Sequence, residues 1–234
     1  MMFWNDDDNP DRIRVPDDIV DLLFGIDCKC LPVDHAYLLA EALKQSLPWI
    51  VEEAGIAVHS VHVAGSQNGW ERPEHGTDSY LVVSRRTKLT LRVPRHRVTE
   101  VLRDLPGAKL DVGGETLVVG TGKTKPLTAE TTLFSRYVAL DLAAPAEEDE
   151  GVFLETAARA LSAMDIRVRK AVCGRTNRLA TPDGSIATRS LMLAGLTPDE
   201  SIRLQQQGLG HHHLLGCGIF IPHKGIDSVK PSQG

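Results

Sequence analysis

The sequence lacks the features of a membrane-spanning or secreted protein. No stretch approaches the roughly 18 consecutive apolar residues that a transmembrane helix requires. Its start, MMFWNDDD, has acidic residues where a secretory signal has basic residues followed by an apolar run. The four cysteines form no CxxC pair, which is typical of reduced thiols in a cytosol; they are Cys28, Cys30, Cys173 and Cys217. We therefore expect a cytoplasmic protein with reduced thiols and no membrane partner.

The sequence also lacks a complete nucleotide or metal motif. GTGKT at 120–124 resembles part of a phosphate-binding P-loop, but that motif requires a further glycine where this chain has Leu117. Three adjacent histidines stand at 211–213 in a short segment, where neighbouring side chains rarely converge on one ion, and no cysteine spacing completes a tetrahedral site. We expect neither a metal nor another cofactor.

Positive charge is in short supply, since 31 acidic residues outnumber 26 basic ones and give a net charge of −5. Phosphate binding needs concentrated positive charge, so this balance by itself disfavours a nucleic-acid partner. The distribution changes that conclusion, because acidic residues gather at 6–8, 17–21 and 147–150 while 85–109 and 165–189 are rich in lysine and arginine. Two basic strips on an acidic body are compatible with RNA binding.

Local signals in the first part of the chain predict the order strand, helix, strand, strand, helix, strand. Alternating apolar residues indicate the strands, Pro32 with Asp34 indicates a helix start, and the apolar residues of 95–105 share one helical face. The expected strands span 20–31, 55–63, 79–93 (one strand or a pair) and 108–119, and the expected helices span 36–50 and 95–105. This is the ferredoxin-like βαββαβ order.

The second part repeats that order without repeating the sequence. Thr197 followed by Pro198 marks one helix start clearly. The expected strands span 133–142, 166–172, 188–193 and 214–221, and the expected helices span 152–164 and 198–207. We therefore predict an α+β fold of tandem ferredoxin-like units, with 1–125 and 126–234 as the two domains.

Four glycines stand in the segment QGLGHHHLLGCGIF, between the last predicted helix and the last predicted strand. They are Gly208, Gly210, Gly216 and Gly218. Glycine allows positive φ and lets backbone N–H groups approach a phosphodiester, which a Cβ would obstruct. A turn between a helix and a strand needs glycine as well. Both interpretations, a cradle for an RNA backbone and a simple turn, are open at this point.

Several segments resemble the crRNA-maturation endoribonucleases of CRISPR systems, the sixth numbered Cas family, in its MYXAN-type branch. They are LPVDHAYLLAEAL, NGWERP, SRRTKLTLRVP, RVRKAVCGRTNRLATPDGSIATRSLML and LQQQGLG...LGCGIFIPHKGI. Together they cover most of the chain from about residue 15 to residue 226. The glycine-rich segment is similar to the C-terminal glycine-rich loop of the repeat-associated RNA-binding superfamily.

The resemblance implies a tandem ferredoxin-like enzyme that recognises and cleaves CRISPR repeat RNA in the precursor transcript to give mature crRNA. It also implies metal-independent chemistry, in which a ribose 2′-hydroxyl attacks the adjacent phosphorus and leaves a 2′,3′-cyclic phosphate and a 5′-hydroxyl. The expected partners are the repeat RNA and other Cas subunits of an effector complex.

Histidine is suited to both proton transfers of this reaction near neutral pH, and there are two groups of candidates. His35 begins the first predicted helix, at a position similar to that of the active-site histidine in some branches of the family, and Tyr37 follows it. His59 and His62 form the rival group, because other branches place their histidine just beyond that helix. Three residues apart in a strand, they point to opposite faces, so at most one faces a common site.

The RNA-binding side chains are expected along the basic strips. Arg167 and Arg169 share one face of the strand predicted at 166–172, which also contains Lys170, although a solvated edge strand explains them equally well. Further phosphate contacts are expected from Arg175, Arg178 and Arg189, contacts to a stem from Arg85, Arg86, Lys88 and Arg92, and a cradle from Gly208, Gly210, Gly216 and Gly218. His211, His212 and His213 stand where we expect Lys or Arg in relatives, so we expect the chemistry at the first helix.

Two other functions are open. A catalytically silent relative would hold the repeat stem as a subunit of an effector complex, with the same fold and basic strips. A tandem ferredoxin-like protein also suits a small-molecule sensor, which the acidic net charge favours mildly. Cleavage of the repeat RNA in EDTA distinguishes the enzyme from the silent subunit, and salt-dependent RNA binding distinguishes both from the sensor.

Overall fold

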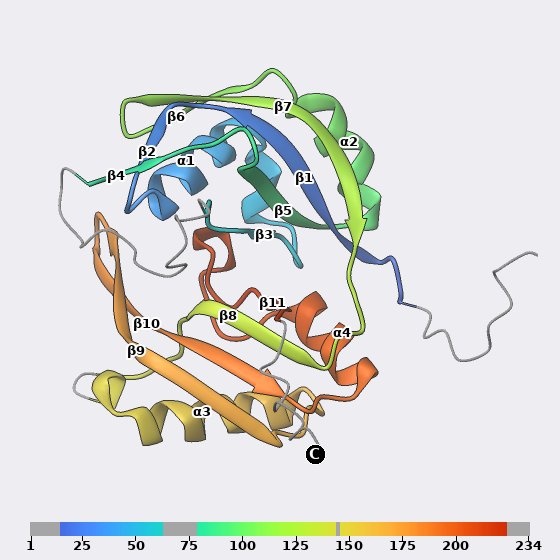
Figure 1. Cartoon of the computed structure of the whole chain (residues 1–234), viewed down its shortest axis with the longest axis vertical. Helices are drawn as coiled ribbons and strands as arrows, with labels where there is room; N and C mark the ends of the chain where they lie inside the picture. Colours follow the sequence, from blue (N-terminus) through green and yellow to red (C-terminus); the bar gives the residue numbers. More distant parts are fainter. Residues whose placement is uncertain (1–14, 63–78, 144–145, 224–234) are drawn as a thin grey trace, which may run out of the picture.

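The computed structural model describes residues 15–62, 79–143 and 146–223, and its main feature is a pair of antiparallel β-sheets (Figure 1). The N-terminal half, residues 15–126, carries a five-stranded sheet, and the C-terminal half, residues 132–223, carries a four-stranded sheet. A further small sheet joins β2 (Cys30–Pro32) to β4 (Tyr80–Val82). Among the described helices, none has the length and apolar character needed to cross a membrane.

The sheet of the N-terminal half has the spatial order β3-β5-β1-β7-β6. Its strands are β1 (Ile19–Asp27), β3 (Ala57–Val58), β5 (Lys88–Pro94), β6 (Lys109–Val112) and β7 (Glu115–Pro126); its helices are α1 (Ala36–Ser46) and α2 (Val98–Asp104), with 3₁₀ turns η1 (Pro48–Val51) and η2 (Arg95–Arg97). Gly113 and Gly114, with φ of 69° and 86°, make the tight turn between β6 and β7. The region expected as a strand at 108–119 is therefore a hairpin of β6 and β7.

Alternation along β1 decides which face of this sheet is buried. Val20, Leu22 and Phe24 lie in the core together with Leu43 of α1 and Val101 of α2. Burial of each such side chain stabilises the fold by roughly 1.5–3 kcal/mol. The intervening residues of β1 point to the opposite face of the sheet, which is turned toward the C-terminal half.

The C-terminal half has the spatial order β11-β8-β10-β9. Its strands are β8 (Thr132–Val138), β9 (Lys170–Thr181), β10 (Gly184–Ala194) and β11 (Ile221–Pro222); its helices are α3 (Glu150–Ala163) and α4 (Pro198–Gln207), with 3₁₀ turns η3 (Ala146–Glu148) and η4 (His213–Leu215). We number the strands of each half by their place in the βαββαβ order. In both halves the second strand then lies beside the third, the third beside the first, and the first beside the fourth. The predicted tandem ferredoxin-like α+β fold is confirmed.

Three predicted strands differ from the observed ones. The strand predicted at 166–172 begins only at Lys170 and runs on to Thr181, where it forms a long hairpin with β10. The last strand is short because Gly216 and Gly218, with φ of 83° and 66°, interrupt an extended backbone. The strand predicted at 55–63 is limited to β3.

The two halves meet beside α1. Both α1 and β3 contact η4, and α1 also contacts β9, whose hairpin with β10 rises toward the N-terminal half in Figure 1. Residues 127–131 connect β7 to β8. The domain division predicted at 125/126 stays a prediction, one residue before β7 ends.

Candidate functional site

A cleft of about 660 Å³ lies where the two halves meet. One wall comes from α1, η1 and residues 53–56, and the other comes from the β9–β10 turn and residues 212–215. Its polar lining residues are Tyr37, Lys44, Glu53, Thr181, Asp183, Ser185, His212 and His213. A cleft of this size that carries convergent polar groups is the default candidate for a binding or active site.

The wall formed by α1 presents two functional side chains. Tyr37 and Lys44 share one face of the helix, because seven residues make about two helical turns. Leu39 and Leu43 are buried in the core and hold the helix against the sheet. The half-buried ammonium group of Lys44 pairs with Glu41 Oε1 at 2.5 Å. The cleft therefore has a phenol and a cation on its N-terminal side.

The four glycines of residues 208–218 serve packing within the protein. All have positive φ, from 66° to 83°, and Gly208, Gly216 and Gly218 are buried. A Cβ at each would meet protein atoms: Gly218 O at position 208, Ala139 O at position 210, Ser60 Oγ at position 216 and Leu209 O at position 218. Close approach of the chain to itself thus explains the need for glycine at these positions, and the RNA cradle stays a prediction.

The histidine triplet is divided among different partners. His211 Nε2 lies 3.0 Å from Asp141 Oδ2, and His213 Nδ1 donates to Cys217 O at 2.9 Å. His212 has φ 62° and ψ 40°, an exposed left-handed position at the edge of the cleft. The three rings therefore do not act as one group.

His35 is held by two backbone groups. Its ring is buried at 3% exposure, Nδ1 donates to Pro32 O at 2.9 Å, and Nε2 accepts from Val61 N at 3.0 Å. It occupies the N-cap position of α1 but makes no side-chain cap hydrogen bond. Both ring nitrogens are thus engaged in fixing the start of α1 against the segment after β3, and the predicted catalytic role has no support in this geometry.

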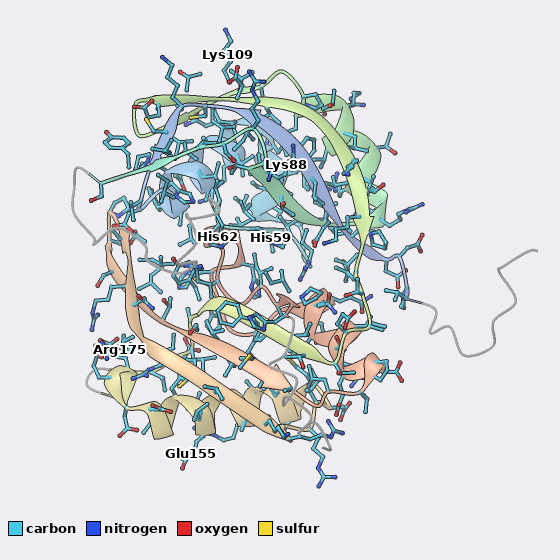
Figure 2. The ribbon with its side chains drawn as sticks, viewed as in Figure 1. His59, His62, Lys88, Lys109, Glu155 and Arg175 are labelled. Carbon is cyan, nitrogen blue, oxygen red and sulfur yellow. The ribbon has the colours of Figure 1, made fainter. Side chains whose placement is uncertain are left out.

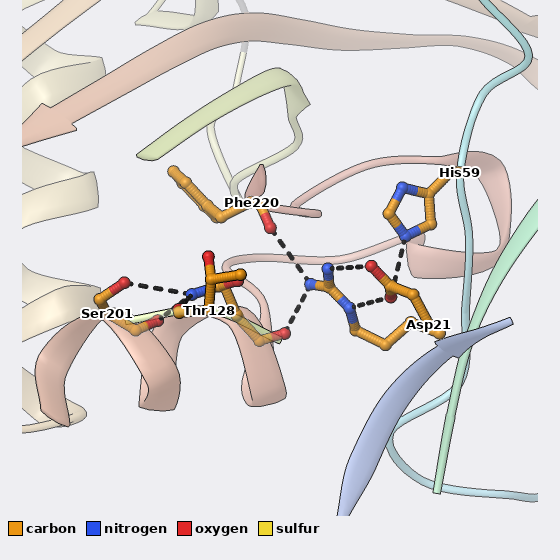
Figure 3. Close-up of polar contacts among 7 residues, drawn as sticks. Asp21, His59, Thr128, Ser201 and Phe220 are labelled. Atoms are coloured by element: carbon orange, nitrogen blue, oxygen red, sulfur yellow. Dashed lines mark hydrogen bonds and ion pairs between the residues drawn. The ribbon is translucent and has the colours of Figure 1, made fainter. Parts of the chain in front are cut away.

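His59 belongs to a buried polar network (Figure 3). Its Nε2 lies 3.4 Å from Asp21 Oδ1, and Asp21 accepts two hydrogen bonds from the guanidinium of Arg92. Burial lowers the pKa of His59, and although Asp21 opposes this effect, the pKa stays below its ordinary value. For Asp21, burial alone would raise the pKa, but the hydrogen bond from His59 and the charge of Arg92 hold it well below its usual range. His59 is therefore a neutral partner in a structural network.

His62 differs from His59 in its exposure. Figure 2 shows both residues between the two halves, and His62 is exposed while His59 is partly buried. Neither residue belongs to β3, so the strand alternation from which opposite faces were expected does not apply to them. Tyr37, the fourth predicted catalytic residue, lines the cleft described above.

Two of the predicted RNA-binding arginines, Arg169 and Arg178, have side chains paired with acidic residues, whereas Arg167 is held through its backbone. Arg169 donates to Glu200 Oε2 at 2.6 Å, and the backbone N of Arg167 donates to Glu200 Oε1. Because both residues precede β9, the predicted row of cations on one strand face is wrong. Arg178 pairs with Glu147 and Glu148.

Two further arginines of the basic strips are buried. Arg189, at 6% exposure, donates to the backbone oxygens of Gly174 and Glu148. Arg92, at 3% exposure, binds Asp21 and two backbone carbonyls of the C-terminal half. These two side chains are structural in this conformation and are not exposed to a phosphate backbone.

The remaining predicted cations are exposed. Arg85 and Arg86 lie in the turn between β4 and β5, Lys170 begins β9, and Arg175 lies where β9 has an extra residue opposite Ser190. In the described part of the chain, none of these four side chains forms an ion pair. They stay available to RNA, as do the exposed side chains of Lys88 and Arg167.

Comparison with known proteins identifies the family. Residues 20–225 match the family described as Cas6 Crispr. The CRISPR-associated endonuclease Cas6 of Myxococcus xanthus (strain DK1622) is 33% identical over 203 residues, which cover 87% of this chain and 81% of that protein. The chain belongs to the Cas6 family.

Solved structures show the fold shared by this Cas6 family member. A structure titled "An RAMP protein binding different RNA substrates" has a TM-score of 0.60 at 12% identity and covers 88% of this chain and 100% of its own. A Cas6-related protein from Pyrococcus furiosus has a TM-score of 0.58 at 13% identity, covering 86% of this chain and 97% of its own. At these identities the likeness concerns the fold alone.

Two lining residues of the cleft, Lys44 and His212, were not among the predicted site residues. Lys44 was detectable, because it lies two helical turns after Tyr37 on the same face of α1. The position of His212 in the cleft had no sequence signal, since it depends on how the two halves meet.

Proposed function

We propose that this Cas6 family member binds CRISPR repeat RNA and cleaves it in the precursor transcript to give mature crRNA. The reaction is metal-independent, and the products carry a 2′,3′-cyclic phosphate and a 5′-hydroxyl. The observation that carries the proposal is the 33% identity, over most of both chains, to a relative named as a CRISPR-associated endonuclease. The cleft between the two halves supplies a site with groups suited to this chemistry.

The cleft supports the roles of named residues. Tyr37 is in position for a hydrogen bond to a ribose or to the leaving oxygen, and Lys44 brings positive charge to the same wall. The exposed side chains of Arg85, Arg86, Lys170 and Arg175 contact phosphates of the repeat RNA outside the cleft. His62 is the predicted histidine whose exposure suits a role in proton transfer.

The partners proposed for this protein are the repeat RNA and other Cas subunits of an effector complex, in the cytoplasm. One of the structures with this fold is titled as an RNA-binding protein, which supports the RNA partner. A catalytically silent subunit that only holds the repeat is the second candidate, because the fold and the exposed cations serve binding equally well.

The test is incubation of the purified protein with its cognate repeat RNA in EDTA. We expect one cut, a cyclic phosphate on the upstream fragment and a hydroxyl on the downstream fragment. A repeat with a 2′-deoxyribose at the cut nucleotide should bind equally and stay intact. Tight binding without cleavage of the all-ribose repeat would establish the silent subunit instead.

The predicted histidines are tested in the same assay with His35→Ala, His59→Ala and His62→Ala. Melting temperature and RNA affinity are measured for each variant beside the rate. We expect His35→Ala and His59→Ala to lower the melting temperature, since both rings hold buried contacts. A large rate loss with normal stability and affinity would restore either residue as a catalytic candidate.

A further inference from the structure

The backbone at His212 is unusual for a residue with a side chain. In the described ranges, Asp165 and His212 are the non-glycine residues with positive φ, 55° and 62° respectively. The left-handed conformation costs such a residue roughly 1–2 kcal/mol, and glycine adopts it without that cost. His212 O accepts hydrogen bonds from Leu215 N at 2.9 Å and Cys217 N at 3.2 Å, which fix the turn. The imidazole of His212 is thus attached to a backbone that is fixed by hydrogen bonds and held in an unfavourable conformation.

The surroundings of His212 distinguish it from its neighbours. Asp141 engages the ring of His211, and the carbonyl of Cys217 engages the ring of His213. Within the described residues, no hydrogen bond or ion pair engages the ring of His212. Its side chain is exposed, and residue 212 lines both the main cleft and an adjoining pocket of about 230 Å³. It is therefore the member of the triplet that is ready to interact with a bound molecule.

The opposite wall of the cleft completes the arrangement. Tyr37 and Lys44 stand on α1, across from the turn that carries His212. A phosphodiester placed in this cleft has an imidazole on one side and a hydroxyl and an ammonium group on the other. These are the groups that in-line cleavage by a ribose hydroxyl requires.

We propose that His212 is the catalytic residue that accepts the 2′-hydroxyl proton in the RNA cleavage by this protein, an inference that rests on the proposed function. The ribose 2′-oxygen forms a bond to phosphorus as its proton moves to the neutral imidazole. The bond from phosphorus to the 5′-oxygen breaks, and this oxygen leaves with the bonding electron pair and takes a proton from water. The imidazolium then returns its proton to solvent.

The electrostatic setting agrees with a base. Partial burial lowers the pKa of His212, the charges of His211 and His213 act in the same direction, and Asp141 opposes them. The other titratable groups that line the cleft are Tyr37, Lys44, Glu53 and Asp183. A lowered pKa keeps the imidazole neutral near pH 7, the form that accepts a proton.

The test uses the full chain and its cognate repeat RNA, with His212→Asn as the main variant. Asparagine adopts the left-handed conformation more easily than most residues, so the turn is preserved while the proton acceptor is removed. The matched control is His211→Asn, which removes the adjacent imidazole that points to Asp141. Single-turnover rates are measured from pH 5 to pH 8, affinities are measured with a 2′-deoxy repeat, and His212→Gly is assayed with and without added imidazole.

We expect His212→Asn to bind RNA as the wild type does and to cleave at least about 100-fold more slowly. The fall in rate at acidic pH should disappear in this variant, imidazole should restore part of the rate of His212→Gly, and His211→Asn should stay within about threefold of the wild type. Cleavage by His212→Asn within threefold of wild type, or losses of rate and affinity in equal proportion, would overturn the inference and leave the proposed function intact. A wild-type protein that does not cut the repeat would overturn both.

Discussion

Arg92 Nε and Nη2 donate hydrogen bonds to the two carboxylate oxygens of Asp21, at 2.8 Å and 3.2 Å. The same guanidinium donates through Nη1 to Gln205 O at 2.6 Å and to Phe220 O at 3.2 Å, so one buried cation links the sheet of the N-terminal half to α4 and to the end of the glycine segment (Figure 3). The two halves are therefore joined at this point by a buried side chain of β5.

Removal of one partner of this pair should be strongly destabilising. We expect Asp21→Ala to lower the free energy of unfolding by about 3–5 kcal/mol, because the buried guanidinium loses its counter-charge. Urea denaturation measures the effect. The control is Asp104→Ala, which breaks the exposed pair with Arg103 and should leave the unfolding free energy nearly unchanged. Equal effects of the two variants would contradict the assignment.

Acid should destabilise the start of α4 through Glu200. Burial alone would raise the pKa of Glu200, but hydrogen bonds from Thr197 N, the Arg169 guanidinium and Arg167 N together lower it to about 2. Because the folded pKa lies below the ordinary 4.5, the stabilisation is fully present above about pH 4.5 and is lost as the pH falls toward 2.

Thermal unfolding of Glu200→Gln between pH 2 and pH 6 measures this contribution. The variant should be less stable than the wild type at pH 6, and the difference should shrink toward pH 2. Asp199→Asn is the neighbouring control, since Asp199 is exposed on the first turn of the same helix. A difference between wild type and Glu200→Gln that is constant with pH would contradict the linkage.

Comparison of Gly210→Ala with Gly107→Ala should distinguish the cost of a steric clash from the cost of a left-handed backbone. A Cβ at Gly210 would overlap the carbonyl oxygen of Ala139, whereas a Cβ at Gly107 would meet nothing within 4 Å; φ is +78° at Gly210 and +86° at Gly107. We expect Gly107→Ala to cost roughly 1–2 kcal/mol for the left-handed backbone and Gly210→Ala to cost more. Chemical denaturation of both variants decides the matter, and equal losses would show that strain alone explains the glycine.

Exposed cations should determine the salt dependence of RNA binding. We expect Lys170→Ala and Arg175→Ala each to weaken binding to repeat RNA and to reduce the slope of log K against log salt by about 0.7–1. Arg178→Ala should have a smaller effect, because Glu147 and Glu148 already neutralise that guanidinium. Affinities at several salt concentrations test this prediction, and equal slopes for all variants would refute it.

The local elements of this fold were readable in the sequence. The start of α4 follows from Thr197, Pro198 and Glu200, whose capping hydrogen bonds are all sequence-local. The lengths of β9 and β10 were predicted too short, because the outer part of this hairpin is exposed and its sequence shows no apolar alternation. Burial patterns predict strands only where one face of the strand is covered.

The candidate site was less predictable, because its contacts join distant segments. Val61, which holds the ring of His35, is 26 residues away, and the two backbone acceptors of Arg92 are 113 and 128 residues away. Residue type alone predicted His35 as a base and Arg92 as a phosphate ligand. In the structure, both side chains form buried hydrogen bonds within the protein. His212 was set aside because a cation was expected there, although its position in the cleft suits it to proton transfer.

The acceptors of Arg92 in the C-terminal half are main-chain oxygens. A substitution at position 205 or 220 would keep this oxygen, but it would remove the side-chain hydrogen bond from Gln205 to Thr128 O or the fully buried ring of Phe220. On the donor side, the joint needs the guanidinium of Arg92 on β5 and the carboxylate of Asp21 on β1. The contact between the halves therefore depends on two side chains of the N-terminal sheet and on the path of the main chain in the C-terminal half.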